Sequence, residues 1–283
     1  MELSIIIVNY EQSHFLGDCL ESVHLTICKT KFEVILVDNS SKDKGLESIL
    51  KRFPETRLID NARNVGFARA NNQGAKTANG DFLFFINPDT IMIKGAVESM
   101  LDYIRSDPSV GILGPKVLNP DQTLQYSCRK FPTIWSGLFN RYSVMTRFFP
   151  NNRYSKDYLM LDYDHSSTRS VDWISGCCMM IPAPIFKEVN GFDENYFLFI
   201  EDVDLCQTMR KKGYRVDYFP SAKIFHKISS SSSQAAPQTI IKHHKGMIYY
   251  NQKYNKTNFV TRYTINSMVM VRCLLQLLFN VVK

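Results

Sequence analysis

The chain has 283 residues and a formal net charge of +7, and 45% of its residues are hydrophobic while 22% are charged. A chain of this size and composition buries a core, as one large α/β domain or two small ones, which excludes a disordered protein. The positive excess is mild and spread along the chain without a dense block of Lys and Arg, which argues against a nucleic-acid-binding arm. It suits anionic partners, such as a nucleotide diphosphate or the headgroups of a membrane surface.

The cysteines and the N-terminal segment both favour a reducing compartment. There are seven cysteines, an odd number, and none has CxxC spacing, which argues against a disulfide framework. The first residues, MELSIIIVNYEQ, contain no basic region and only a short apolar run, so they predict a strand rather than a signal peptide. We therefore expect a cytoplasmic protein.

The first ninety residues or so alternate between strand-like and helix-like segments. The expected strands cover residues 3–10, 32–40, 56–61 and 80–90, and the expected helices cover 14–27, 46–53 and 67–79. The strands are short β-rich apolar runs, which indicates burial on both faces. Strands that alternate with helices predict a mostly parallel, doubly wound α/β sheet with helices on both faces.

Polar residues follow three of these strands at the point where each ends. Asn9 follows SIIIV, Asp38 follows VILV, and Asn87 and Asp89 follow FLFFI. Ligands of such sheets bind at the carboxyl ends of the strands. These four residues are therefore the first candidates for a site.

The second half of the chain is less regular at first. Residues 116–170 are aromatic, contain several prolines and show little periodicity, so we expect a long excursion that contributes to an acceptor pocket. A strand is expected over 171–181, then a short helix and loop, a helix from about Glu201 to Lys212 that ends at Gly213, and a strand over 214–220. The five serines after AKIFHK predict a mobile loop.

The C-terminal segment NSMVMVRCLLQLLFNVV is strongly apolar. Its polar residues Arg272, Gln276 and Asn280 recur every four positions and form one stripe on a helix. A membrane-spanning helix needs roughly 20 largely uncharged residues, and a central Arg is costly there. An interfacial helix or a packed terminal helix fits better, the latter lying on the core or in a homodimer interface.

In its motifs the chain resembles the family 2 inverting glycosyltransferases with the GT-A fold, and among them the bacterial rhamnosyltransferases that build cell-surface polysaccharides. Seven segments match in family order over residues 3–226: SIIIVNY, VILVDNSSKD, NVGFARANNQG, GDFLFFINPDT, SGCCMMI, GFDENYFLFIEDVDLCQTMRKKGY and IFH. We expect a glycosyltransferase domain over residues 1–230, with a nucleotide-sugar half (1–100) and an acceptor and metal half (101–230). Residues 231–283 would form a helical extension.

The resemblance implies how the donor nucleotide-sugar is bound. Asp38 would bind the base or ribose, because a carboxylate accepts from an imide N–H or a hydroxyl; the alternative is that it only caps the next turn. Asn9 belongs to the same expected binding set. The helix start at Gly66 is a natural anion site, with Asn64 and Asn71 as expected polar contacts. The alternative there is a capped helix with an exposed Asn71.

The segment NPDT stands where the family has its D-x-D metal motif. Asn87 replaces the first Asp, so Asp89 is the remaining strong oxygen ligand. The family pattern adds a histidine after the last strand, which matches His226, and this pair suits Mn²⁺ or Mg²⁺. The alternative is that His226 is a hydrogen-bonded structural residue.

Three acids follow the apolar run FLFI directly. At a helix start they interact favourably with the macrodipole, by roughly 0.3–1 kcal/mol per charge, but this does not explain their position after an apolar run. The resemblance implies that Asp202 is the general base that takes a proton from the acceptor hydroxyl, with Glu201 as second candidate. Asp204 would point away and be structural. Trp173, Ser175 and Gly176 are expected to line the acceptor or donor pocket.

The resemblance thus implies an inverting, metal-assisted glycosyltransferase. By the same resemblance, the favoured reaction moves L-rhamnose from dTDP-rhamnose to a glycan or polyprenyl-linked acceptor, on the inner face of the cytoplasmic membrane. The alternatives are a UDP-sugar transferase and a non-catalytic sugar- or lipid-binding relative, which Asn87 leaves open. A nucleotidyltransferase and an NAD-dependent oxidoreductase are disfavoured, because their glycine-rich phosphate-binding motifs are missing.

Overall fold

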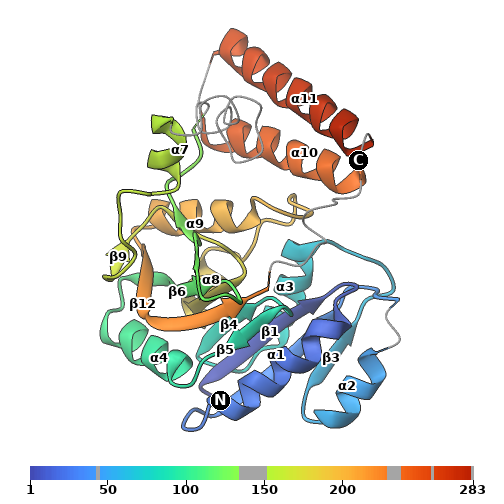
Figure 1. Cartoon of the computed structure of the whole chain (residues 1–283), viewed down its shortest axis with the longest axis vertical. Helices are drawn as coiled ribbons and strands as arrows, with labels where there is room; N and C mark the ends of the chain where they lie inside the picture. The colour runs from blue at the N-terminus through green and yellow to red at the C-terminus, as the bar shows by residue number, and fades with distance from the viewer. Residues whose placement is uncertain (43–44, 134–151, 228–236, 256–257, 282–283) are drawn as a thin grey trace.

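A computed structural model of the chain describes residues 1–42, 45–133, 152–227, 237–255 and 258–281 (Figure 1). Its centre is a mixed sheet whose main path runs β3-β2-β1-β4-β11-β6-β12-β5. These strands are β1 (Leu3–Asn9), β2 (Phe32–Asp38), β3 (Arg57–Asp60), β4 (Phe82–Ile86), β5 (Thr90–Met92), β6 (Val110–Leu118), β11 (Cys178–Pro182) and β12 (Arg215–His226). The pairs among β1 to β4 and the pair β6–β12 are parallel, whereas β11 runs antiparallel to β4 and β6. The predicted mostly parallel α/β sheet is confirmed.

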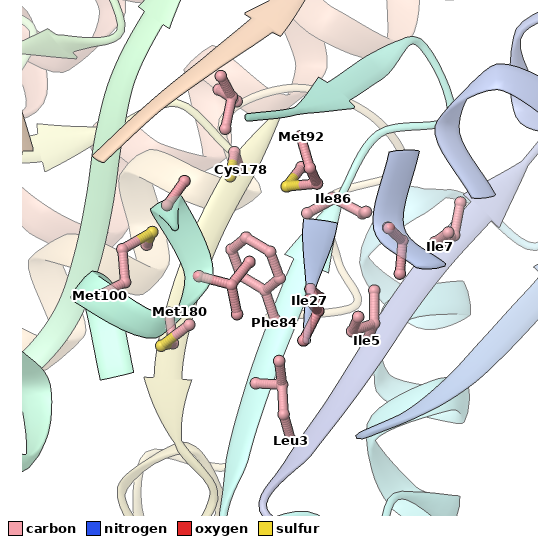
Figure 2. Close-up of a cluster of buried hydrophobic side chains, with 14 of the residues drawn as sticks. Leu3, Ile5, Ile7, Ile27, Phe84, Ile86, Met92, Met100, Cys178 and Met180 are labelled. Carbon is pink, nitrogen blue, oxygen red and sulfur yellow. The ribbon is translucent and has the colours of Figure 1, made fainter. Parts of the chain in front are cut away.

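Helices cover both faces of this sheet. The helices are α1 (Ser13–Thr26), α2 (Leu46–Arg52), α3 (Phe67–Thr77), α4 (Ala96–Ser106), α7 (Arg153–Tyr158), α8 (Ala183–Glu188), α9 (Glu201–Lys211), α10 (Pro237–Tyr254) and α11 (Phe259–Val281). Leu3, Ile5 and Ile7 of β1 join a core with residues of α1, α2 and α4 (Figure 2), whereas Ile6 and Val8 join a second core with residues of α3, α8 and α9. This alternation follows from the two-residue period of a strand.

The parallel register fixes where the polar strand ends lie. Asn9 is the partner of Asp38 across β1 and β2, and Ile7 is the partner of Ile86 across β1 and β4. Neighbouring strands lie about 4.8 Å apart, so the ends of β2, β1 and β4 form one edge roughly 10 Å wide. The candidates that follow these strands therefore share that edge of the sheet.

The segment predicted as one strand over 171–181 is two strands. Trp173–Ile174 (β10) pairs with Cys128–Arg129 (β8) in a small separate sheet, and Cys178–Pro182 (β11) enters the main sheet. The chain turns between them at Ser175 to Cys177, where Ser175 N donates to Ser127 O at 2.7 Å. Ser175 and Gly176 interrupt the apolar residues at this turn, and this Ser-Gly pair is the sequence signal that could have indicated it.

Elsewhere the differences concern length and local order. The strand expected over 214–220 continues to His226, with an irregular register between Phe219 and Lys223. In the irregular region 116–170, the described residues form the end of β6, β7 (Leu124–Gln125), β8, α7 and β9 (Arg169–Ser170). The serine run lies outside the described residues.

The C-terminal region contains two helices, α10 and α11, that pack against each other as a hairpin, and the domain boundary expected at residue 230 stays a prediction. Helix α11 lies against α10 at the end of the molecule opposite the N-terminus, and α10 lies between α11 and the sheet domain (Figure 1). None of the helices within the described ranges is long and apolar enough to span a bilayer. The division of residues 1–230 at residue 100 stays a prediction.

Candidate active site

The carboxylate of Asp38 is held at the shared ends of β1 and β2. Asn9 Nδ2 donates to Asp38 Oδ1 at 2.8 Å, and Ser41 N donates to Asp38 Oδ2 at 3.0 Å. The turn-capping role weighed for Asp38 is therefore present. Each carboxylate oxygen can accept a second hydrogen bond, so capping does not exclude ligand binding. Asn9 Oδ1 is buried and has no partner among the described residues, which leaves an acceptor at this edge.

A network of asparagines fixes the loop that leads to Gly66. Asn64 Oδ1 accepts from Asn39 Nδ2 at 2.9 Å and from Gly66 N at 2.9 Å. Asn39 Oδ1 accepts from Val65 N at 2.9 Å. The sequence analysis named Asn64 and Gly66 but missed Asn39, the residue that joins the loop to the end of β2. Asn39 begins the hydrophilic segment NSS, which indicates a turn after β2 but no particular contact.

Gly66 is where two of the matching motifs touch. Its φ of +93° lies in the left-handed region, and a Cβ atom built on it would approach Phe197 O to 2.7 Å, so only glycine fits. Phe67 N, the next residue, donates to the same carbonyl at 2.8 Å. Asn71 is buried rather than exposed, and its Nδ2 donates to Phe67 O at 3.0 Å within α3. A contact between Asn71 and a donor sugar stays a prediction.

Asp89 and His226 meet beyond the ends of β4 and β12. The distance between Asp89 Oδ1 and His226 Nε2 is 3.1 Å, and Asp89 is almost fully buried. His226 Nδ1 lies 2.7 Å from Gln125 Oε1, and because an amide oxygen only accepts, Nδ1 carries the proton. In a neutral imidazole with this proton, the lone pair of Nε2 would face Asp89 Oδ1. Gln125 was missed by the sequence analysis, since it lies in the aperiodic region.

This arrangement fits a hard divalent cation. Asn87 Oδ1 and Asp89 Oδ1 are buried without a hydrogen-bond partner in the described part of the chain. Amide and carboxylate oxygens with one neutral imidazole are a suitable ligand set for Mn²⁺ or Mg²⁺. The spacing of 3.1 Å between Asp89 and His226 is close to the ~3 Å between adjacent ligands that each lie about 2.1 Å from an ion. Over the described residues, no group of three or more His, Cys, Asp and Glu side chains could hold a metal. Further ligands would have to come from elsewhere.

Asp202 and Glu201 begin α9 and differ in their surroundings. Asp202 Oδ2 accepts from Gly176 N at 2.9 Å, and Asp202 Oδ1 accepts from Val203 N at 2.8 Å. Burial raises the pKa of Asp202 although these two amides lower it. The pKa of Glu201 is raised well above its ordinary value by burial and by the Asp202 charge. The Glu201 Oε2 atom is buried without a partner among the described groups.

The turn directly before Glu201 and Asp202 has a strained backbone. Asp204, later in the same helix, has different partners from these two acids. Phe199 and Ile200 have φ values of 66° and 70°, which is unusual for a bulky residue and more so for a β-branched one. Asp204 accepts from Tyr196 Oη at 2.9 Å and from Lys253 Nζ at 2.9 Å. Asp204 is therefore structural, as predicted, and ties α9 to α10. Left-handed strain of this kind is concentrated at functional sites.

Arg129 is a cation near Asp202 that the sequence analysis missed. Its guanidinium lies 4.9 Å from the ring centre of Trp173, and its positive charge lowers the pKa of Asp202. Trp173 is buried and its Nε1 donates to Lys130 O at 2.8 Å. Trp173 thus supports Arg129, and its direct contact with a ligand stays a prediction. Arg129 pairs with Trp173 across β8 and β10, a contact that no sequence period indicates.

The turn from Ser175 to Cys178 contacts both the Asn87–Asp89 side of the site and the Asp202 side. Burial, and to a smaller extent the charges of Asp89 and Asp202, raise the pKa of the Cys177 thiol to about 12. Cys177 O also accepts from Asn87 N at 3.0 Å. The Ser175 side chain donates to the Cys177 thiol, and Ser175 N donates to Ser127 O just before β8. The turn SGCC therefore connects the segment of Asn87 and Asp89 to the first turn of α9, where Asp202 lies.

Comparison with known families and proteins gives a consistent result. The model of glycosyl transferase family 2 matches residues 4–187, and that of the N-terminal domain of galactosyltransferase matches residues 163–230. N-acetylglucosaminyl-diphospho-decaprenol L-rhamnosyltransferase of Mycobacterium tuberculosis is 30% identical over 254 residues, which cover 86% of this chain and 81% of that protein. Rhamnosyltransferase WbbL of Escherichia coli K12 is 27% identical over 231 residues, which cover 78% of this chain and 82% of the relative.

Solved structures share the fold at low sequence identity. GalNAc-T7 with UDP, GalNAc and Mn²⁺ matches with a TM-score of 0.64 and 16% identity, over 87% of this chain and 47% of that one. The mannosyltransferase PcManGT of Pyrobaculum calidifontis with GDP-Man and Mn²⁺ matches with a TM-score of 0.61 and 15% identity, over 96% and 69%. At these identities the likeness establishes the fold alone.

Proposed function

Because the chain belongs to glycosyltransferase family 2 and is rhamnosyltransferase-like, we propose that it moves a sugar from a nucleoside diphosphate to an acceptor hydroxyl with inversion at the anomeric carbon. The single observation that carries this proposal is that the SGCC turn contacts both parts of the site: Cys177 O accepts from Asn87 N, near the Asp89–His226 pair, and Gly176 N donates to Asp202 Oδ2. The Asp89–His226 pair would lie at the diphosphate of the donor, and Asp202 would accept the proton of the acceptor hydroxyl.

Asp202 is the general base in this proposal. The acceptor O–H donates to the carboxylate, the hydroxyl oxygen attacks the anomeric carbon, and the bond to the nucleoside diphosphate breaks as the proton passes to Asp202. Burial raises the pKa of Asp202, which makes its carboxylate a better proton acceptor than an exposed one. Attack opposite the leaving group in a single displacement inverts the configuration.

Glu201 takes a supporting place. Its pKa is raised further because it is buried and next to the Asp202 charge, which favours its protonated form. A protonated carboxyl cannot act as a base. A protonated Glu201 would place no second negative charge beside Asp202. The single negative charge of the two carboxyl groups would then lie on Asp202, which accepts from Gly176 N.

Asp89 and His226, with the amide oxygen of Asn87, would hold Mn²⁺ or Mg²⁺. A bound cation would offset negative charge on the departing diphosphate. Gln125 fixes the His226 tautomer that such an ion requires, because it accepts the Nδ1 proton at 2.7 Å. Asp38 and Asn9 would bind the nucleoside at the neighbouring strand ends.

The donor and acceptor are proposed from the relatives. The M. tuberculosis relative is named an L-rhamnosyltransferase, and its name gives an N-acetylglucosaminyl-diphospho-decaprenol. We therefore favour dTDP-rhamnose as donor and a polyprenyl-diphosphate-linked sugar as acceptor, in polysaccharide synthesis. UDP-sugars are the alternative donors.

A donor screen tests the proposal. Thermal shift with a panel of nucleotide-sugars, with and without Mn²⁺, should give the largest rise in melting temperature for dTDP-rhamnose with the metal, because ligands that bind the folded state stabilise it by mass action. Release of dTDP should then require the same metal. Binding without any turnover, on addition of acceptors, would instead support a non-catalytic sugar-binding relative.

A further inference from the structure

The charge of this protein is divided sharply along the chain, rather than spread as the sequence analysis held. All 27 acids lie in residues 1–217, where they face 25 of the 34 Lys and Arg residues. The remaining nine Lys and Arg residues follow Asp217, and no acid accompanies them. The hairpin of α10 and α11 is therefore a purely cationic part of the molecule.

The outer face of α11 carries large apolar side chains. Seven of them are between 56% and 71% exposed: Phe259, Val260, Tyr263, Met270, Val271, Leu274 and Leu278. At 100° per residue these positions fall on one side of the helix, within about 120° of arc. They form two groups, residues 259–263 and 270–278, and the described part of the chain does not cover them.

The polar side of α11 is turned inward. Arg272 Nη1 lies 3.6 Å from Met247 Sδ of α10, and the Arg272 charge adds to burial in lowering the pKa of His243 and His244 on the same helix. Ile265 is buried on this inner side too. The central arginine, which is costly in a bilayer, is thus kept away from the apolar face. An exposed apolar face therefore remains on the side of α11 that points away from the protein (Figure 1).

We propose that this face of α11 lies in the interfacial region of an anionic lipid bilayer. An amphipathic helix binds there by burying its apolar side chains at the headgroup boundary, and nearby cations add attraction to anionic lipid. Lys245 of α10 and Arg262 of α11 are exposed cations on the hairpin. A second copy of the chain is a poorer partner, because two acid-free hairpins would bring like charges together.

This docking deepens the proposed function, on which it rests for the nature of the acceptor. Helix α10 joins the hairpin to the acid turn, since Lys253 of α10 bonds Asp204 of α9 at 2.9 Å. A membrane under α11 would hold a polyprenyl-linked acceptor at the same end of the molecule as Asp202. The bilayer contact and the transfer reaction can nevertheless be tested separately.

The test is co-sedimentation of the full-length protein with vesicles at about 0.15 M salt. The vesicles contain phosphatidylcholine alone or phosphatidylcholine with phosphatidylglycerol. We expect binding to the anionic vesicles at this salt concentration. At higher salt the affinity should fall by about fivefold for each Lys or Arg whose attraction to anionic lipid is screened. Leu274→Glu should bind at least tenfold more weakly, and Leu278→Glu should repeat this loss at a second position.

Leu25→Glu is the matched control. Leu25 is 69% exposed and lies in α1, away from the hairpin, so the same substitution there should leave vesicle binding unchanged. Release of dTDP from dTDP-rhamnose in solution should be equal in all of these proteins. If vesicle binding follows this pattern and no protein turns over the donor, the docking stands and the proposed reaction fails.

The docking is overturned if the intact protein fails to sediment with anionic vesicles, or if it binds neutral vesicles equally well. It is also overturned if Leu274→Glu binds vesicles as tightly as the Leu25→Glu control. If light scattering shows a dimer that Leu274→Glu converts to a monomer without changing vesicle binding, then the face is an interface between two copies.

Discussion

The edge formed by β1 and β2 and the turn before α9 are built in opposite ways. At the edge, Asp38 ends a regular strand, and both of its oxygens accept hydrogen bonds from Asn9 and Ser41. At the turn, two bulky residues adopt left-handed conformations, and Glu201 keeps a buried oxygen without a partner among the described residues. The first arrangement is unstrained, as suits the ligand-binding role that we propose for it. The second combines backbone strain with a buried carboxyl whose pKa is raised, as suits the proposed catalytic role.

The largest effect should come from removing the charge at the turn. Asp202→Asn leaves the shape of the side chain but cannot accept the acceptor proton, so kcat should fall by about 10³-fold, within the range for loss of a general base. Asp102→Asn makes the same change on an exposed position of α4 and should leave kcat unchanged. Steady-state release of dTDP measures both variants. A kcat for Asp202→Asn within threefold of wild type would remove Asp202 from the base role.

A smaller effect is expected at Gln125, which contacts neither region but accepts from His226 and is proposed to act through it. Gln125→Ala removes the acceptor for the Nδ1 proton, so the concentration of Mn²⁺ needed for half-maximal activity should rise by about 10- to 100-fold. Gln125→Glu restores an oxygen acceptor and should recover much of this loss. Metal titration of activity and of thermal stability measures the effect. An unchanged metal requirement in Gln125→Ala would show that Gln125 does not position His226.

The charge balance at the turn predicts a pH effect. Asp202 must be deprotonated to act, and burial raises its pKa, so kcat/KM should fall as the pH falls through this raised value. Arg129 lowers the pKa of Asp202, so Arg129→Met should move this acidic limb to higher pH. Arg129→Lys keeps the charge and should move the limb less. A limb that stays in place in Arg129→Met would separate Arg129 from the base.

The smallest expected effect tests the strain directly. In an ordinary exposed helix Gly is less stable than Ala by roughly 1 kcal/mol, but Phe199 has a φ of 66°, which favours Gly. Phe199→Gly should therefore be more stable to urea than Phe199→Ala, by about 1 kcal/mol. If Phe199→Ala is the more stable of the two, the turn is not strained.

How far the sequence could predict these two regions follows from how they are built. The sheet and the strand-end residues Asn9, Asp38 and Asp89 follow from local apolar runs, so they could be predicted. Asn39, Gln125 and Arg129 were missed because tertiary pairing, rather than any period, brings them to the site. The turn at Ser175 was missed for a different reason: the Ser175–Gly176 pair that favours a turn was overlooked between two apolar strands. The strain before α9 was visible only as an odd contrast between FLFI and the acids.

Two matched substitutions test most directly the central claim, that one region binds the donor and the other activates the acceptor. Asp38→Asn and Asp202→Asn make the same chemical change at the edge and at the turn, and titration calorimetry with dTDP-rhamnose and Mn²⁺ measures donor affinity in each. The account predicts at least tenfold weaker binding for Asp38→Asn and a Kd within about twofold of wild type for Asp202→Asn. Equal losses in both variants, or a loss confined to Asp202→Asn, would contradict it.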